Sequence, residues 1–375
     1  MTTRRELESA KARAAENILE SCVGRHGMWA GNGRYAWQCW TRDFAFATMP
    51  YLLEEERYSD VRRHLETLSR RQRPNGQIPI VYLDGLRGQI RFLADKTKKS
   101  VRDRKMSFML RRFLDGQLWN LTPGTRDSEI LYLLAMYEYG KREPRFLERY
   151  QENLDDAIGH VESRLMVDGL HTGADWRDTM EKELANTPLL TNNCILYRVY
   201  VLSGQKHRAA ELRKRILATH FPTWGDGDPR VIDYPGVDRC DPLGTSFAVL
   251  YDVAGPMHRA TALIGISTVD SRTGVTIRCK HNPLNEKERL MIERTGGVVT
   301  WPFVVGFTVL ALLNLGARAF AEEQFAKMTA LDGFREYYDP SDATGYGEVD
   351  QLWSAVLYLR AYHAIRAARE SSASE

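Results

Sequence analysis

Two acidic loops contain the side chains whose types and spacing could carry out acid–base chemistry. They are GLHTGADWRDTM (169–180), with Asp175 and Asp178, and GFREYYDPSDATGYGEVDQLW (333–353), with Glu336, Asp339 and Asp342. Hydrolysis of a glycosidic bond with inversion requires a protonated carboxylic acid near the leaving oxygen and a carboxylate that activates water, about 6.5 to 9.5 Å apart. One carboxyl group from each loop would supply this pair. The loops alone do not choose among these carboxyl groups, because acidic loops before helices are commonly helix caps or turns.

The elements that must position the two loops are helices. Apolar residues recur at helical spacing along the whole chain, whereas alternating apolar and polar runs are few and short. The spacing predicts twelve helices, at residues 3–22, 42–54, 58–72, 127–140, 144–164, 191–204, 206–219, 244–254, 256–267, 302–315, 317–330 and 349–367.

These helices form pairs joined by short breaks, several of them marked by a glycine such as Gly140 or Gly316. In each pair the earlier helix is the more apolar (VVGFTVLALLNLG) and the later one is charged and amphipathic (FAEEQFAKMTAL). This pattern indicates an inner ring of helices wrapped by an outer ring. We therefore predict an all-α fold, a closed (α/α)6 barrel, with the long loops before the inner helices gathered at one end. The two acidic loops precede the third and sixth inner helices, so they would face each other across the mouth.

Tryptophans are concentrated in these long loops. Six of the eight in the chain lie there, namely Trp37, Trp40, Trp176, Trp224, Trp301 and Trp353. A tryptophan near a helix end often serves packing, but this concentration favours a funnel on which sugar rings stack.

The composition describes a folded protein and names no macromolecular partner. Hydrophobic residues make up 43% and charged residues 27% of the chain, and the net charge of +3 is far from that of a dedicated nucleic-acid binder. The five cysteines are scattered without a CxxC pair, which favours reduced thiols over a disulfide framework or a zinc site. The nine histidines show no paired ligand spacing, so we expect no metal and no cofactor.

The sequence also indicates a cytoplasmic protein without a membrane partner. The first twenty residues form a charged amphipathic helix and contain no apolar core of a secretory signal. Residues 298–316 are almost continuously apolar, but Pro302 interrupts them, and we interpret this stretch as a buried core helix.

We predict one catalytic domain over residues 1–370 and a disordered tail over 371–375. A basic insertion at about 85–113 interrupts the helical pattern. Its cations are Lys96, Lys98, Lys99, Arg102, Arg104, Lys105, Arg111 and Arg112. We expect a solvated flap here, with a lid over the site or a docking surface for an acidic partner as alternatives.

Five segments carry a resemblance to a known group of enzymes. They are WTRDFAFATMPYLL (40–53), TRDSEILYLLAMYEYG (125–140), DGLHTGADWRDTM (168–180), GGVVTWPFVVGF (296–307) and FREYYDPSDATGYGEVDQLWSAVLYLRAY (334–362). In this order they resemble the (α/α)6-barrel glycoside hydrolases, above all the glucosidase domain of glycogen-debranching enzymes, with related features in trehalase, mannosylglycerate hydrolase and neutral invertase.

The resemblance implies roles for individual residues. It transfers the general base to Glu336. A debranching-enzyme alignment puts the general acid on Asp178, whereas a trehalase-like alignment puts it on Asp175. The substrate contacts that it implies are Trp40, Arg42, Asp43, Asp127, Trp176, Asn193, Trp301, Gln351 and Trp353.

The chain also departs from that pattern. Thr191 and Asn192 stand ahead of Asn193, where relatives carry an acidic or aliphatic residue, so contacts with the sugar are expected to differ. The separate amino-terminal sugar-binding domain of the debranching enzymes is missing from this sequence, which favours a small glycoside over a branched polymer.

The expected function is therefore an inverting glycoside hydrolase that acts on an α-linked glucoside or a related small oligosaccharide. Two alternatives use the same barrel. One is a sugar 2-epimerase, which relies on histidines for proton abstraction. The other is a catalytically silent carbohydrate-binding protein.

Overall fold

An inner ring of helices forms the centre of the molecule. The computed structural model describes residues 3–102, 126–223, 229–279, 283 and 285–373. Within these ranges, the ring consists of η1 (Asp43–Thr48) continued by α2 (Met49–Glu54), α6 (Ser128–Gly140), α10 (Leu190–Leu202), α12 (Pro242–Leu250), α15 (Pro302–Asn314) and α17 (Leu352–Ala373). Each inner helix packs against the next, and α17 packs back against η1, which closes the ring.

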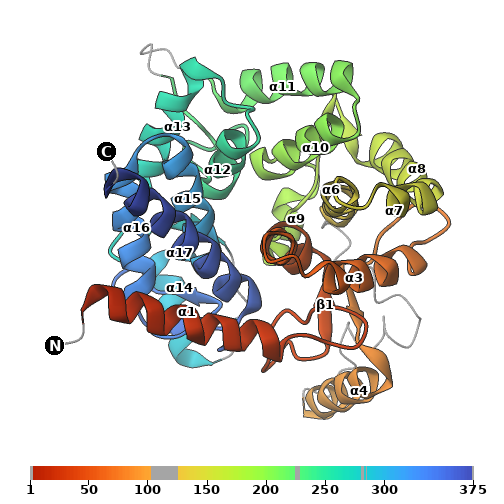
Figure 1. Ribbon diagram of the computed structural model, residues 1–375, viewed down its shortest axis with the longest axis horizontal. Helices are drawn as coiled ribbons and strands as arrows, with labels where there is room; N and C mark the ends of the chain where they lie inside the picture. Colours follow the sequence, from red (N-terminus) through yellow and green to blue (C-terminus); the bar gives the residue numbers. More distant parts are fainter. Residues whose placement is uncertain (1–2, 103–125, 224–228, 280–282, 284, 374–375) are drawn as a thin grey trace.

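A second set of helices surrounds this ring (Figure 1). It consists of α1 (Arg4–Ser21), α3 (Tyr58–Arg70), α7 (Pro144–Arg149) with α8 (Gln151–His160) and η3 (Val161–Leu165), α11 (Lys206–His220), α13 (Pro256–Thr268) and α16 (Arg318–Ala330). Each outer helix packs against a neighbouring inner helix, as α11 does on α10 and α16 on α15. The predicted all-α (α/α)6 barrel is confirmed.

The apolar pattern of each helix explains its layer. Residues Pro302 to Val309 of α15 are buried without interruption, because the helix touches α12, α16 and α17. Helix α11 instead buries Ala209, Leu212 and Ile216, whose spacing of three and four residues lies along one face. The apolar stretch 298–316 is therefore part of the core, and among the described residues no helix is long and apolar enough to cross a membrane.

The loops before the inner helices are joined into a rim at one end of the ring. Gly31 bridges to Gln351, Thr300 pairs with Tyr338 through hydrogen bonds of 3.0 and 2.8 Å, and the Arg126 amide donates to Ala174 at 3.0 Å. In the part of the chain that the structure describes, four antiparallel two-stranded sheets reinforce these loops. They are β1 (Gln38–Trp40) with β2 (Val81–Leu83), β3 (Met166–Val167) with β4 (Leu170–His171), β5 (Ile277–Arg278) with β6 (Val298–Val299), and β7 (Tyr337–Tyr338) with β8 (Gly345–Tyr346).

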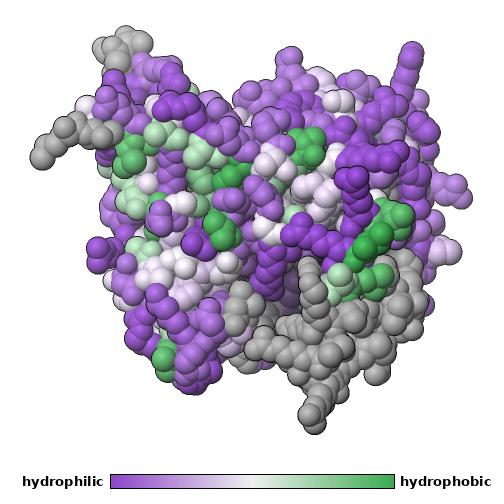
Figure 2. Space-filling model, turned by 90° about the horizontal axis from the view of Figure 1, so that it is seen from below, coloured by the Kyte–Doolittle hydropathy of each residue, from purple (hydrophilic) through white to green (hydrophobic). Residues whose placement is uncertain are grey.

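Within the described ranges, four further helices lie in the connections. They are α4 (Gly85–Arg102), η4 (Asp178–Met180), α9 (Glu181–Leu184) and α14 (Glu286–Thr295). Helix α4 forms the first part of the predicted basic insertion and exposes Leu86 and Ile90, while residues 103–113 lie outside the described ranges. The face in Figure 2 is mainly hydrophilic, with apolar residues scattered in small groups.

The carboxyl-terminal end of the chain differs from the expected disordered tail. Helix α17 continues to Ala373, and residues 374–375 lie outside the described ranges. Arg366 and Glu370 form an ion pair of 3.4 Å across one turn, which supports the helix near this end.

Candidate active site

Arg42 joins three of the rim loops. It precedes η1, is 3% exposed, and donates to Asp127 Oδ1 at 3.2 Å and to the Trp176 carbonyl at 3.1 Å. The same guanidinium also forms an ion pair with Asp178. The loops before the first, second and third inner helices therefore meet at one buried cation.

Glu336, in the loop before the sixth inner helix, is held by both of its carboxylate oxygens. The Tyr35 hydroxyl donates to Oε1 at 3.0 Å, and the Glu348 amide donates to Oε2 at 3.0 Å. Glu348 is itself 2% exposed, and its carboxylate accepts hydrogen bonds from the amides of Gly33 (3.1 Å), Arg34 (2.7 Å) and Tyr35 (3.2 Å). The first rim loop is thus fastened to the loop that contains Glu336.

One series of contacts leads from Asp178 to Glu336 through polar and aromatic side chains. Asp178 pairs with Arg42, whose guanidinium carbon lies 5.7 Å from the ring centroid of Trp40. The Trp40 ring lies edge-on to Tyr35 at 6.1 Å, and Tyr35 donates to Glu336.

A second series links the two loops through aromatic rings. Trp176, two residues before Asp178, lies 5.0 Å from Trp301 between ring centroids. Trp301 in turn lies 5.3 Å from Tyr337, the residue after Glu336. The two acidic loops, separated by more than a hundred residues in the chain, are therefore connected by two separate series of contacts.

Asp43 experiences the charges of both candidate catalytic groups. Burial raises the pKa of Asp43 well above its ordinary value, Arg42 lowers it, and the negative charges of Glu336 and Asp178 raise it further. Gln351 donates to Asp43 Oδ1 at 3.0 Å. Asp43 therefore lies within electrostatic range of both Asp178 and Glu336.

Exposure separates the carboxyl groups of this region into two sets. The side chain of Asp178 is 24% exposed and Glu336 is half-buried. Asp43, Asp127 and Asp175 are 5% exposed or less. Of these five groups, Asp178 and Glu336 are the ones that a molecule from solvent can reach most easily.

Asp175 is engaged in a buried ion-pair network. Arg177, which is 1% exposed, donates from Nε to Asp175 Oδ1 at 2.9 Å and from Nη2 to Oδ2 at 2.8 Å. Arg177 also contacts Asp233, with Nη2 to Oδ1 at 3.1 Å. Both oxygens of Asp175 thus accept hydrogen bonds from the Arg177 guanidinium, a charge-assisted bidentate contact.

Asn193 is also occupied by the protein itself. Its Nδ2 donates to the carbonyls of His171 and Leu189, each at 2.9 Å, and its Oδ1 accepts from the His171 amide at 2.8 Å. These bonds fasten β4 to the start of α10. The structure therefore places Asn193 in the support of a rim loop, apart from the contacts that join Asp178 to Glu336.

Aromatic side chains line the region between the acidic loops. Trp353 stacks on Phe303 with centroids 4.1 Å apart, and Trp176 lies edge-on to both at 6.2 and 5.0 Å. The indole nitrogens of Trp176 and Trp353 are buried and have no hydrogen-bond acceptor among the described residues. Buried donors of this kind are normally paired, so these two nitrogens are exceptions within the described part of the chain.

Sequence reasoning did not find Tyr35 and Glu348. The glycine-rich segment before Tyr35 carried the one local signal, because a Cβ on Gly33 would lie 2.3 Å from Glu348 Oε1. Glu348 follows Gly347 in the same loop as Glu336, and no sequence motif marks its carboxylate as a contact of the segment before Tyr35.

The described residues show no metal site and no histidine in the contacts that link Asp178 to Glu336. No group of three or more His, Cys, Asp or Glu side chains within the described ranges could hold a metal ion. Burial lowers the pKa of His171 to about 3 and that of His220 to about 4, which keeps both imidazoles neutral.

The chain has the fold of known glycosidases. A wild-type glycosidase matches with a TM-score of 0.63 and 15% identity, over 97% of this chain and 99% of that chain. A variant glycosidase in complex with glucose matches with a TM-score of 0.65 and 15% identity over the same shares. A GH63 mannosylglycerate hydrolase from Thermus thermophilus in complex with glucose matches with a TM-score of 0.59 and 15% identity, over 93% of this chain and 99% of that chain. No family model and no curated protein sequence matches the chain.

Proposed function

We propose that the protein is an inverting glycoside hydrolase in which Asp178 is the general acid and Glu336 the general base. The observation that carries the proposal is the double connection between the loops of Asp178 and Glu336, both of which are more accessible than Asp43, Asp127 and Asp175. Two carboxyl groups on either side of a sugar-binding mouth are what inversion requires.

Asp178 suits the role of the acid better than Asp175. Burial raises the pKa of Asp178, and this outweighs the lowering effect of Arg42. Arg42 also donates to Asp127 and to the Trp176 carbonyl, so Asp178 is not its only partner. Asp175 is enclosed and held as an ion-pair partner by Arg177, which makes it a structural group.

Glu336 suits the role of the base. Burial raises its pKa, which increases its basicity, whereas the amide of Glu348, the charge of Arg34 and the hydroxyl of Tyr35 favour the ionised form. An oriented carboxylate of this kind removes a proton from water as the water attacks the anomeric carbon, while Asp178 protonates the departing oxygen.

A small α-linked glucoside is the proposed substrate. Two of the solved structures that share this fold contain glucose. The half-buried Trp40 offers an aromatic surface to a sugar ring. The five cysteines are buried free thiols, which is compatible with the proposed cytoplasmic location.

The epimerase alternative has less support. It requires histidines as proton carriers, whereas the residues that connect Asp178 and Glu336 are carboxylates, arginines and aromatics. His171 and His220 are fully buried.

The proposal is tested by a screen of α-linked disaccharides, glucosylglycerate and mannosylglycerate, with the product followed by proton NMR from the first minutes. Inversion predicts that an α-linked substrate releases the β-anomer before mutarotation. First appearance of the α-anomer would contradict the two-carboxylate scheme. Saturable sugar binding without hydrolysis would instead support the silent carbohydrate-binding alternative.

A further inference from the structure

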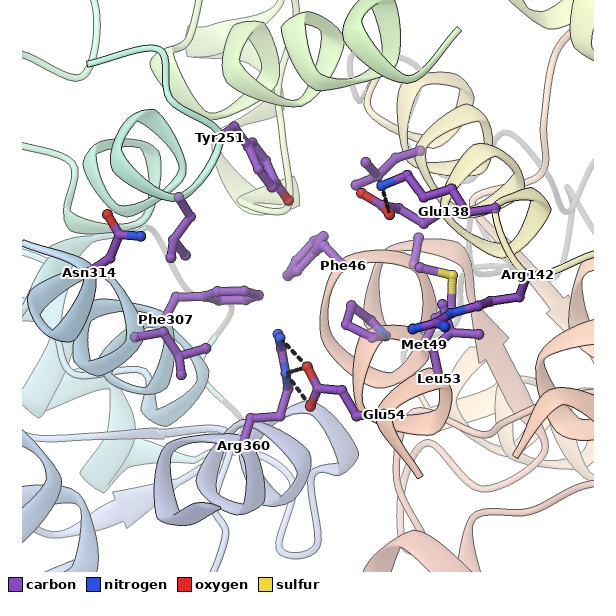
Figure 3. Close-up of a pocket in the computed structure, with 16 residues that line it drawn as sticks. Phe46, Met49, Leu53, Glu54, Glu138, Arg142, Tyr251, Phe307, Asn314 and Arg360 are labelled. Carbon is purple, nitrogen blue, oxygen red and sulfur yellow. Dashed lines mark hydrogen bonds and ion pairs between the residues drawn. The ribbon is translucent and has the colours of Figure 1, made fainter. Parts of the chain in front are cut away.

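A second cavity lies at the end of the ring opposite the acidic loops. Its volume is about 720 Å³, and its lining comes from η1, α2, α6, α12, α15 and α17. The acidic loops precede the amino-terminal ends of the inner helices. Glu54 and Asn314 line the cavity from the last residues of α2 and α15, Tyr251 from just past α12, and Arg360 from the third turn of the longer α17. Figure 3 shows these side chains arranged around a central opening.

An aromatic layer separates this cavity from the candidate active site. Phe46 and Phe307 line the cavity and are 2% and 3% exposed. The opposite side of Phe46 contacts Phe303 at 5.9 Å and Trp353 at 6.2 Å between centroids, and both of these rings belong to the aromatic lining near the acidic loops. The two sites are therefore distinct spaces.

The wall of the cavity is largely apolar and its rim is charged. Leu53, Leu134 and Leu310 lie in the wall with the aromatic rings. A volume of 300 to 1,000 Å³ lined by apolar side chains and a few polar groups is typical of small-molecule sites.

The charges of the rim are unbalanced. Glu54 pairs with Arg360 at 2.7 Å, and Glu138 pairs with both Arg198 at 2.7 Å and Lys141 at 2.6 Å. Arg142 is exposed and pairs with no acidic group in the described part of the chain. In Figure 3 its guanidinium lies beside Met49 and Leu53 at the edge of the opening. Every acid of the rim is already compensated, so the surplus charge is positive.

We propose that this cavity binds a small organic anion with an apolar body, such as an aryl or medium-chain carboxylate or sulfonate. The apolar body lies in the cavity against Leu53, Leu134 and Leu310, on the layer formed by the mutually contacting rings of Phe46 and Phe307, and the anionic group lies at the rim near Arg142. Burial of the apolar body supplies most of the affinity, and the rim charge selects an anion over a neutral molecule.

The test uses two fluorescent probes, anionic 1-anilinonaphthalene-8-sulfonate and neutral N-phenyl-1-naphthylamine, titrated into the full chain at low ionic strength. We expect saturable binding of one anionic probe per chain. Arg142→Ala should weaken binding of the anionic probe about fivefold, which is the upper range for a single surface charge. The affinity for the neutral probe should not change. Arg145→Ala removes an exposed arginine that does not line the cavity, and it should bind both probes as the wild type does.

Leu310→Trp fills the cavity and should abolish binding of both probes. Leu53→Trp fills it from another helix and replaces the first variant if circular dichroism shows that Leu310→Trp does not fold. Non-saturable binding, equal affinity of wild type and Arg142→Ala for the anionic probe, or full binding by a folded cavity-filled variant would overturn the proposal. The readout does not depend on hydrolysis, so its result is separate from that of the proposed function.

Discussion

The amide of Glu348 lies 3.0 Å from Oε2 of Glu336, and the carboxylate of the same Glu348 holds the loop that brings Tyr35 to the other oxygen. A single buried acid thus orients the candidate base from two directions. Its carboxylate accepts hydrogen bonds from three backbone amides, those of Gly33, Arg34 and Tyr35. Glu348 is therefore a positioning residue for the proposed reaction.

Replacing Glu348 with alanine should lower both stability and turnover. Three amides would lose their acceptor, and a loss of about 1 to 3 kcal/mol in the free energy of unfolding is expected. Because Tyr35 would no longer be held against Glu336, kcat of Glu348→Ala should also fall. Glu348→Gln should lose less stability and less kcat, since the side-chain amide oxygen of glutamine can still accept hydrogen bonds from these amides. Urea unfolding and steady-state kinetics measure the two effects.

Asp350→Asn is the matched control, because Asp350 lies in the same loop and makes one long contact of 3.5 Å with Asn32. It should behave as the wild type. A Glu348→Ala protein with unchanged kcat and unchanged stability would show that the loop needs no such anchor.

Replacing Tyr35 with phenylalanine should move the acidic limb of the pH profile. The Tyr35 hydroxyl donates to ionised Glu336 and thereby lowers the pKa of that carboxyl. Without this bond the pKa rises, so the acidic limb of kcat/KM should shift to higher pH while the protein stays folded. Tyr197→Phe changes a hydroxyl on α10, outside the contacts that link Asp178 to Glu336, and should leave the profile in place. An unshifted limb in Tyr35→Phe would contradict the role of Glu336 as the base.

The sequence was sufficient to predict the barrel because the inner helices are apolar around most of their circumference, whereas the outer helices are apolar along one face. The stretch around Phe307 and the 209, 212, 216 spacing of α11 are such local signals. The opposition of the third and sixth loops followed from the ring alone, without any knowledge of side-chain contacts.

The finer features of the site could not be predicted, since they depend on contacts between distant segments. Glu348 lies 315 residues from Gly33, and Asp233 lies 56 residues from Arg177. The sequence pattern left Asp175 and Asp178 as alternatives for the general acid, because it does not reveal that Arg177 forms a bidentate ion pair with Asp175. The resemblance likewise assigned Asn193 to substrate binding, although its side-chain amide donates to the backbone carbonyls of His171 and Leu189.

Substrates with different leaving groups should separate the two proposed catalytic roles. Asp178→Asn should lower kcat/KM for an α-glucoside by about 10² to 10⁴, but far less for α-glucosyl fluoride, whose leaving group needs little protonation. Glu336→Gln should lower the rate for both substrates by a similar factor, because water still has to be activated. Equal losses on both substrates for Asp178→Asn would argue against its role as the acid.

Asp175→Asn is the companion variant for that comparison. It removes the charge of one of the two acidic partners of the buried Arg177. The free energy of unfolding should therefore fall, by about 3 to 5 kcal/mol if the loss is typical of a broken buried ion pair. Thermal unfolding measures this loss. A stable Asp175→Asn protein that hydrolyses the fluoride but not the glucoside would transfer the acid role to Asp175.

The ionisation of Asp127 should make the stability of the protein depend on pH. Burial, only partly offset by Arg42, raises the pKa of Asp127 to about 7 in the folded state, whereas an unfolded aspartate titrates near ~3.9. The folded state therefore binds the extra proton between these values. The proton bound to Asp127 stabilises the folded state fully below about pH 4, and this contribution is lost as pH rises through 7. The free energy of unfolding then falls by at most about 1.4 kcal/mol per pH unit.

Asp127→Asn cannot ionise, so its free energy of unfolding in urea should fall less between pH 5 and 8 than that of the wild type. The exposed Asp156→Asn should keep the wild-type dependence, and parallel curves for wild type and Asp127→Asn would show that Asp127 is ionised throughout this range.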